Sequence, residues 1–222
     1  MRFTWSALAI VMVCGTHAFG QPAPTGSQGT TSPAPTTESE AASAWSFSAT
    51  VFTYVLPDEG NYVLPIVAAE HDRLRFEARY NYEDRDTASL WVGYKFTGGN
   101  SLEWEVSPMF GAVFGQTTGV APGYQASVSW SKLDFYSEGE YVFDSGDSSD
   151  SFFYNWSEFA VVPVDWFRVG LVTQRTRVYK TDRDVQRGLL VGFSYRDLEA
   201  TTYVFNPDDS KPVVVISVGV SF

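Results

Sequence analysis

The sequence predicts an all-β fold, a transmembrane antiparallel up-and-down β-barrel of about twelve strands, and three observations lead to it. Most of the chain after Trp45 alternates apolar and polar residues with the period of two that a β-strand requires. Aromatic residues make up 16% of the 222 residues, a load that barrels use for interfacial girdles. Residues 212–222 form a strand with one wholly apolar side. A soluble β-sandwich is the alternative, because its strands alternate too.

The last strand, residues 212–222, has two sides of different character. One side is apolar and ends on an aromatic residue, and it consists of Val214, Ile216, Val218, Val220 and Phe222. The other side is small, polar or β-branched and consists of Val213, Val215, Ser217, Gly219 and Ser221. A strand that closes a barrel in lipid needs this division, because one face meets acyl chains and the other meets a lumen.

This pattern resembles the C-terminal strand of bacterial outer-membrane β-barrel proteins, a porin-like superfamily. In that family a terminal Phe after alternating apolar residues is recognised by the barrel-assembly machinery. The resemblance implies that Phe222, Val220 and Val218 are the assembly signal, and that outer-membrane lipid and the assembly machinery are partners. It also implies the cell outer membrane as the location. It covers about Trp45 to Phe222 and includes no family-specific motif.

The N-terminal part has two segments that cannot belong to a barrel. Residues 1–20 have a positive start, an apolar stretch too short to span a bilayer and small residues before a cleavage point, so they predict a cleaved signal peptide. The only cysteine, Cys14, would leave with it; a lipoprotein signal is the alternative, although Val13 is larger than such signals prefer. Residues 21–44 are rich in Pro, Thr and Ser and predict a disordered periplasmic leader.

From Trp45 to Phe222 the alternation predicts the barrel itself. The expected strands are 45–56, 61–70, 73–82, 87–96, 101–115, 120–130, 133–143, 151–162, 165–178, 186–196, 198–205 and 212–222. Twelve is an even number, as in bacterial single-chain barrels, and the count falls to ten if marginal strands merge. Pro108 predicts a bulge in its strand, and the face of Glu158 is ambiguous.

The connections between these strands alternate in length along the chain. Short gaps, such as 71–72, 131–132, 163–164 and the Gly turn 97–100, alternate with longer polar gaps, such as 144–150. Short turns on the periplasmic side and longer loops outside are typical of a barrel with both termini in the periplasm.

Charged residues on the polar faces of the strands are the candidate lumen-lining set. They are Arg75, Glu77, Arg79, Lys95, Glu103, Glu105, Glu138, Glu140 and Arg168, with Gln174 and Arg196 as possible additions. Strand direction places Arg75, Lys95 and Glu105 near the periplasmic end and Glu138 nearer the middle. These side chains either line a small water-filled pore and tune its selectivity, or form internal ion pairs that fill a narrow barrel.

The first function hypothesis is therefore a small passive channel or transporter for polar solutes, and the second is a non-conducting structural or binding barrel. An enzyme is a third hypothesis without a visible nucleophile or acid–base pair: His17 leaves with the signal and His71 lies in a periplasmic turn. We expect no catalytic site, no cofactor and no metal. The run 144–150 could hold Ca²⁺ but lacks the order of the known loop. A net charge of -11 argues against a nucleic-acid partner.

The tryptophans have two interpretations. Most of them fall near strand ends and predict an interfacial girdle: Trp45, Trp91, Trp104, Trp130, Trp156 and Trp166. Trp91 alternates onto the lumen face, where a sugar-stacking platform is the alternative.

Overall fold

The computed structural model describes residues 45–57, 60–178 and 184–222, which form a single antiparallel sheet. Its strands are β1 (Ser46–Val55), β2 (Tyr62–His71), β3 (Leu74–Tyr80), β4 (Thr87–Tyr94), β5 (Phe96–Gly99), β6 (Leu102–Gly115), β7 (Gly119–Trp130), β8 (Leu133–Asp144), β9 (Phe152–Val164), β10 (Phe167–Val178), β11 (Asp184–Tyr195), β12 (Leu198–Phe205) and β13 (Val213–Ser221). A short 3₁₀ turn, η1 (Ser148–Asp150), precedes β9. Within the described residues, no helix has the length and apolar character needed to cross a membrane. The signal and leader predicted for residues 1–44 lie outside the described residues.

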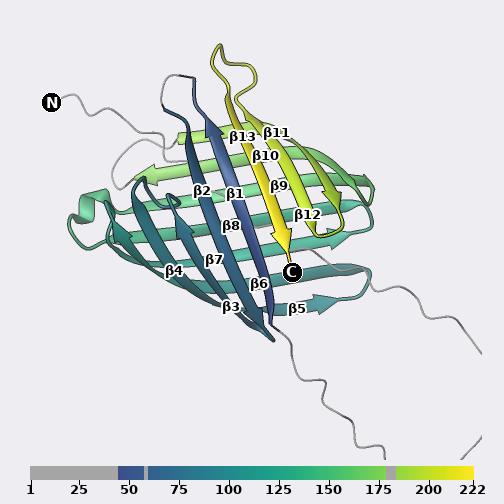
Figure 1. The fold of residues 1–222 in the computed structure, drawn as a ribbon, viewed down its shortest axis with the longest axis horizontal. Coiled ribbons are helices and arrows are strands. Elements are labelled where there is room, and N and C mark those ends of the chain that lie inside the picture. The colour runs from purple at the N-terminus through teal and green to yellow at the C-terminus, as the bar shows by residue number, and fades with distance from the viewer. Residues whose placement is uncertain (1–44, 58–59, 179–183) are drawn as a thin grey trace, which may run out of the picture.

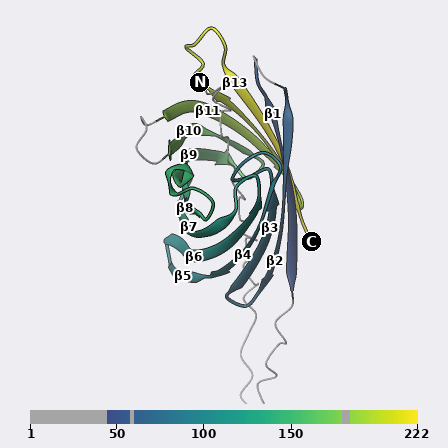
Figure 2. The same cartoon turned by 90° about the vertical axis from the view of Figure 1, so that its left-hand side faces the viewer.

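The sheet closes into a barrel because its first and last strands pair. β1 and β13 run antiparallel from Ser48 opposite Ser221 to Val55 opposite Val214. Every other strand pairs with its sequence neighbours, except that β4 pairs with β6 as well as β3. β5 continues the line of β4 along β6, so the closed wall has twelve strands, as predicted. Figures 1 and 2 show the two sides of this wall, with β1, β2 and β13 facing β7, β8 and β9.

The break between β4 and β5 replaces the bulge predicted at Pro108. Gly93 pairs with Met109 and Phe96 pairs with Val106. The interrupted part of the pairing therefore lies opposite Pro108, whose nitrogen cannot donate a hydrogen bond. The register of β6 against β7 is constant across Pro108, so the bulge prediction was wrong. The predicted Gly turn at 97–100 was also displaced, because β5 runs to Gly99.

The two ends of the barrel differ in their connections. At the end where β1 starts and β13 finishes, which we call the turn end, two-residue turns join the strands at 72–73, 100–101, 131–132, 165–166 and 196–197. The connections at the opposite, loop end are 56–61, 81–86, 116–118, 145–151, 179–183 and 206–212. The predicted alternation of short and long connections is confirmed, with the turn predicted at 163–164 shifted to 165–166.

Side chains alternate between a mainly apolar outer face and a mixed inner face. On β13 the exposed residues include Ile216 and Val218, whereas Val215 is fully buried inside. Large exposed apolar residues occur on the outer face of every long strand, which is the band that a lipid-embedded barrel requires. Trp45, Trp104, Trp130 and Trp166 are exposed on this face, all close to the turn end, in agreement with a girdle.

Trp156 does not belong to that girdle. It lies in the middle of β9, points inward and is completely buried. Trp91 also points inward and is buried, as its alternation predicted.

A charge on the outer face should destabilise the barrel far more than an apolar change. We expect Val218→Arg to lower the free energy of unfolding by about 2–4 kcal/mol, because Val218 is half exposed near the middle of β13. Denaturant unfolding in phospholipid vesicles measures it, with Val218→Leu as the control that should leave stability unchanged. Equal stability of the two variants would contradict a lipid-facing position.

Candidate functional site in the barrel lumen

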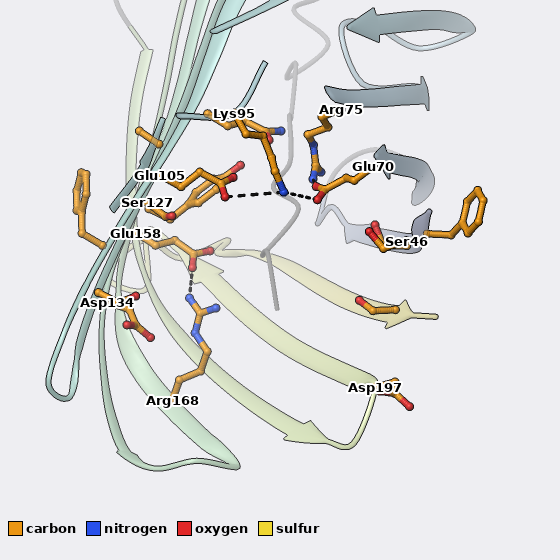
Figure 3. Close-up of a pocket in the computed structure, with 18 of the residues that line it drawn as sticks. Ser46, Glu70, Arg75, Lys95, Glu105, Ser127, Asp134, Glu158, Arg168 and Asp197 are labelled. Atoms are coloured by element: carbon orange, nitrogen blue, oxygen red, sulfur yellow. Dashed lines mark hydrogen bonds and ion pairs between the residues drawn. The ribbon is translucent and has the colours of Figure 1, made fainter. Parts of the chain in front are cut away.

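A polar cavity of about 460 Å³ opens inside the barrel at the turn end, and we call it the vestibule. Its charged and amide side chains come from seven strands, the β4–β5 break and a turn: Glu70, Arg75, Lys95, Glu105, Gln125, Asp134, Glu158, Arg168 and Asp197. Serines fill much of the remaining wall, including Ser46, Ser127, Ser129 and Ser221. Figure 3 shows that the charged groups form two clusters that approach the vestibule from different walls.

The first cluster joins four consecutive segments of the wall. Glu70 at the end of β2 bonds both Arg75 on β3 and Lys95 at the β4–β5 break. Lys95 Nζ is also 4.0 Å from a carboxylate oxygen of Glu105 on β6 (Figure 3). The structure thus brings Arg75, Lys95 and Glu105 to one height, as strand direction predicted. Glu70 was not in the candidate set, because the segment before it is apolar on both faces.

The second cluster is the ion pair of Glu158 on β9 with Arg168 on β10. Glu158 is almost fully buried and faces inward, which resolves the ambiguity in the sequence. Arg168 needs the bare backbone of Gly192 on β11 beside it, since a Cβ there would lie 2.6 Å from Arg168 Cγ.

Above the vestibule, a buried network fills the middle of the lumen. Glu77 accepts hydrogen bonds from Arg75 Nε (2.5 Å), Arg79 Nε (2.8 Å) and Gln125 Nε2 (3.0 Å). Arg79 also donates to Glu140 at 3.2 Å, which ties β3 to β8 across 61 positions of sequence. All these groups are at least nine-tenths buried, so this part of the network is an internal filling rather than a wetted wall.

Two tyrosines extend the network to a further carboxylate. Tyr82 and Tyr136 both donate to Glu138 on β8, at 2.8 Å and 3.1 Å. Neither tyrosine was in the candidate set, because a phenol on a strand is as compatible with a core or a girdle as with a carboxylate partner.

Trp91 is packed so that its ring is not open to a sugar. The guanidinium of Arg79 lies 4.5 Å from the Trp91 ring and 4.1 Å from the Tyr82 ring. The indole also lies against Gly111, where an added Cβ would be 2.4 Å from Trp91 Cε2. With Arg79 and Gly111 both against the indole, the stacking platform considered from the sequence is not available in this arrangement.

The β3–β4 loop, residues 81–86, folds into the lumen from the loop end. Positive φ values at Asn81 and Asp86 turn the chain, and Asn81 Oδ1 accepts the Asp86 N–H at 2.8 Å. As a result Tyr82 and Glu83 are buried inside the barrel. Burial raises the pKa of Glu83, although Trp91 Nε1 donates to one of its oxygens at 3.2 Å. Its other oxygen has no hydrogen-bond partner among the described residues.

Aromatic side chains from both walls close the lumen beyond the charged network. We call Tyr54, Tyr62, Tyr154, Trp156, Tyr203 and Phe205 the aromatic plug. Trp156 stands edge-on to Tyr203 and Phe205, with ring centroids 5.2 Å apart in each case. Tyr54 and Tyr62 stack at 4.7 Å. Tyr54, Tyr154 and Trp156 have zero exposure, so the side chains in the middle of the plug are sealed from water.

The inward-facing charge is unbalanced. The acidic side chains on the inner side are Glu70, Glu77, Glu83, Glu103, Glu105, Asp134, Glu138, Glu140, Glu158 and Glu199. The basic ones are Arg75, Arg79, Lys95 and Arg168. Each of these basic groups has at least one carboxylate partner, so the uncompensated charge of the lumen is negative.

The remaining candidates lie away from the vestibule centre. Glu103 falls on the inner register of β6 but is exposed at the turn end, and Gln174 is buried on the inner face of β10. Arg196 was wrongly added to the wall, because it lies in a turn over the Tyr195 ring. His71 ends β2 beside the Trp45 ring, at 4.9 Å. In the run 144–150, Asp144 accepts hydrogen bonds from the loop backbone.

The assembly-signal candidates lie on the outer face. Val218 and Phe222 are exposed, and Phe222 stacks on Phe47 of β1 at 6.0 Å. Their recognition by assembly machinery stays a prediction.

No family model and no curated protein matches this chain. Among solved structures it is similar to the KdgM porin, with a TM-score of 0.60 and 12% identity over 79% of this chain and 99% of the porin. The structure of the same porin in complex with disordered oligogalacturonate also gives a TM-score of 0.60, at 10% identity. The NanC porin gives 0.53 at 14% identity, covering 79% of this chain and 98% of that one. These likenesses show that the fold is that of porin-type bacterial outer-membrane β-barrels.

Breaking the buried network should lower the free energy of unfolding much more than breaking a surface ion pair. We expect Glu77→Gln to lower the free energy of unfolding by about 3–5 kcal/mol, because it removes the shared charge partner of Arg75 and Arg79. Asp208→Asn is the matched control: it breaks the exposed pair with Arg187 and should leave the free energy of unfolding nearly unchanged. Denaturant unfolding of both variants in detergent provides the comparison, and similar losses would argue against an ion-paired core.

Proposed function

We propose that the protein is a channel of the bacterial outer membrane that admits small polar solutes and prefers cations. The vestibule carries the proposal: it is a polar cavity inside a porin-type barrel, and its basic groups are already paired with carboxylates. Asp134 faces the same space without an ion-pair partner among the described residues. A narrow space with excess negative charge concentrates cations and repels anions.

The apolar outer band supports the membrane location. The two-residue turns support a periplasmic position for the turn end and the vestibule in this proposal, because short turns face the periplasm in such barrels. We do not extend the ligand of the KdgM porin to this chain. Oligogalacturonate is a polyanion, and the lumen described here has the opposite charge preference.

The structure corresponds to a closed channel in this proposal. The aromatic plug and the inward β3–β4 loop separate the vestibule from the loop end, so conduction requires the loop or the plug to move. Opening of the loop would have to break the hydrogen bonds that hold it, among them Tyr82 with Glu138, Glu83 with Trp91 and Asn81 with the Val63 carbonyl.

A second candidate function is a non-conducting barrel that binds a ligand in the vestibule or serves the envelope structurally. The complete burial of Trp156 and Tyr154 favours this candidate, since tight aromatic packing at this level of the lumen excludes water from both side chains. An enzymatic role has less support than either, because His71 lies at the outer edge of the barrel and not at the vestibule.

Ion selectivity in a planar bilayer tests the proposal. We expect the wild-type protein to show a reversal potential that favours cations, and Asp134→Asn with Glu105→Gln to move it toward zero, because both residues line the vestibule. Asp150→Asn with Asp209→Asn removes the same charge from exposed loops and should leave the reversal potential unchanged. Absence of any conductance from a barrel that keeps heat-modifiable mobility on a gel would reject the channel and leave the second candidate.

The proposal also predicts how conductance depends on pH. Since burial raises the pKa of Glu83, the inward loop is most stable when Glu83 is protonated, and that stability is lost as pH rises through the raised pKa. Conductance should therefore increase with pH.

The groups that face Glu83 are Arg79, Ser89, Trp91 and Glu140, so Glu83→Gln isolates its contribution from theirs. Conductance measured between about pH 4 and about pH 8 should lose most of its pH dependence in this variant. An unchanged pH profile would assign the gating to another group.

A further inference from the structure

Two buried carboxylates in the lumen each have one oxygen without a hydrogen-bond partner. Glu83 on the inward β3–β4 loop accepts from Trp91 at Oε1, and its Oε2 has no partner among the described residues. Glu140 on β8 accepts from Arg79 at Oε2, 3.2 Å away, and its Oε1 likewise has no partner in the described part of the chain. Glu83 is 0% exposed and Glu140 is 4% exposed. Unsatisfied polar atoms at this depth are rare in folded proteins and need an explanation.

The other carboxylates of the buried network do not share this property. Three N–H donors reach the two oxygens of Glu77. One tyrosine hydroxyl reaches each oxygen of Glu138. Among the carboxylates of this network, the unmet hydrogen-bonding capacity is therefore confined to Glu83 and Glu140.

Contacts with Trp91 place these two carboxylates close to each other. The indole that bonds Glu83 lies against the bare backbone of Gly123 on β7. A Cβ added at Gly123 would be 3.2 Å from Trp91 Cζ3 and also 3.2 Å from Glu140 Cβ. Arg79, which bonds Glu140, lies over the same indole ring. Of the charges around Glu140, that of Glu83 acts on it most strongly, ahead of the bonded Arg79. The loop thus brings its carboxylate next to the one on β8.

Ionisation of both carboxylates would leave negative charge without a cation of its own. Arg79 bonds Glu140, but it also pairs with Glu77 at 2.7 Å, so its charge is already divided. Two neighbouring buried carboxylates do not both ionise readily, and one of them takes up a proton instead. The other charged or titratable groups that face the pair are neighbours on the loop, β3, β8 and β9: Glu77, Arg79, Tyr82, Glu138 and Tyr154.

A proton fits this place better than a metal ion does. Ca²⁺ and Mg²⁺ need about six oxygen ligands, whereas the pair offers two free oxygens. Within the residues that the structure describes, no group of three or more His, Cys, Asp or Glu side chains is placed to hold a metal ion. A single proton needs only two oxygens, because the protonated oxygen donates to the oxygen that lacks a donor on the other residue.

We propose that Glu83 and Glu140 form a proton-binding site, in which one proton is shared between Glu83 Oε2 and Glu140 Oε1. The shared proton joins the β3–β4 loop to β8 inside the lumen. As pH rises and the proton is lost to water, repulsion between two carboxylates replaces the hydrogen bond and favours movement of the loop out of the lumen. The pH response of Glu83 then belongs to the pair and not to Glu83 alone. The site itself does not depend on conduction, and only its effect on opening rests on the channel proposed above.

Infrared spectroscopy of the folded barrel tests for the shared proton, because a protonated carboxyl group has a C=O stretching band distinct from those of a carboxylate. At neutral pH we expect a wild-type band that Glu83→Gln, Glu140→Gln and the double variant each reduce by the same amount. Either change removes the same proton, and the new amide donates in its place. Glu158→Gln is the control: it removes an equally buried carboxylate that is paired with Arg168, and it should leave the band unchanged. A wild type without the band, or a double variant that loses more of it than either single variant, would overturn the proposal.

Hydrogen exchange of the loop amides tests the consequence for the loop. The Asp86 N–H donates to a side chain of the same loop at 2.8 Å, so it is protected while the loop keeps this form. We expect its exchange, relative to the chemical rate in an unfolded peptide, to accelerate with rising pH in the wild type and in Glu158→Gln. This pH dependence should be lost in Glu83→Gln and in Glu140→Gln. A dependence that persists in Glu140→Gln would assign the proton to Glu83 alone and contradict the shared site.

These measurements separate the proton site from the channel. Neither of them requires conductance, so a barrel that shares the proton but never conducts would reject the channel and leave the site. A conducting barrel without the shared band would do the reverse. Heat-modifiable mobility on a gel shows that each variant is folded.

Discussion

The pairing of the first strand with the last is the interaction on which the rest of this structure depends. Phe47 and Phe222 exchange backbone hydrogen bonds of 2.8 Å and 2.9 Å, so the final residue of the chain is bonded into β1. In lipid an unpaired strand edge leaves donors and acceptors that no solvent can satisfy. Closure removes both edges at once, and it also fixes which side of every strand faces inward. The apolar outer band and the charged inner face are therefore two consequences of one set of backbone hydrogen bonds.

Closure also explains why the charges of the lumen lie where they do. Charges remote from water are tolerated only when partners compensate them, and Glu77 satisfies this with Arg75, Arg79 and Gln125. Less complete pairing, as at Asp134, occurs at the vestibule, where water has access. Toward the loop end the wall is aromatic, so it contains no buried charge that a partner must compensate. Along one narrow interior the wall therefore changes from paired charges to aromatic side chains.

The sequence was most informative where alternation was uninterrupted. In β3 it placed Leu74 and Phe76 outside and Arg75, Glu77 and Arg79 inside, as the structure has them. It failed where both faces have the same character. The segment of β2 before Glu70 is apolar on both sides, because its inner face contributes to the core. Its two faces therefore do not differ in polarity, and the sequence gives no sign that Glu70 points inward. Trp156 was assigned to the girdle for a related reason: period two cannot tell a lipid-facing indole from one that fills a lumen.

The outer face and the lumen network are joined at β8. Asn155 on the outer face donates to the main-chain carbonyl of Glu138, whose side chain accepts from Tyr82 and Tyr136 inside the barrel. A contact that immobilises Asn155 therefore immobilises the backbone that carries Glu138. Tyr82 belongs to the loop that folds into the lumen, so its hydrogen bond to Glu138 links that loop to the same strand. Movement of the loop that breaks the hydrogen bond from Tyr82 would therefore act on the same short segment of β8 to which Asn155 is bonded.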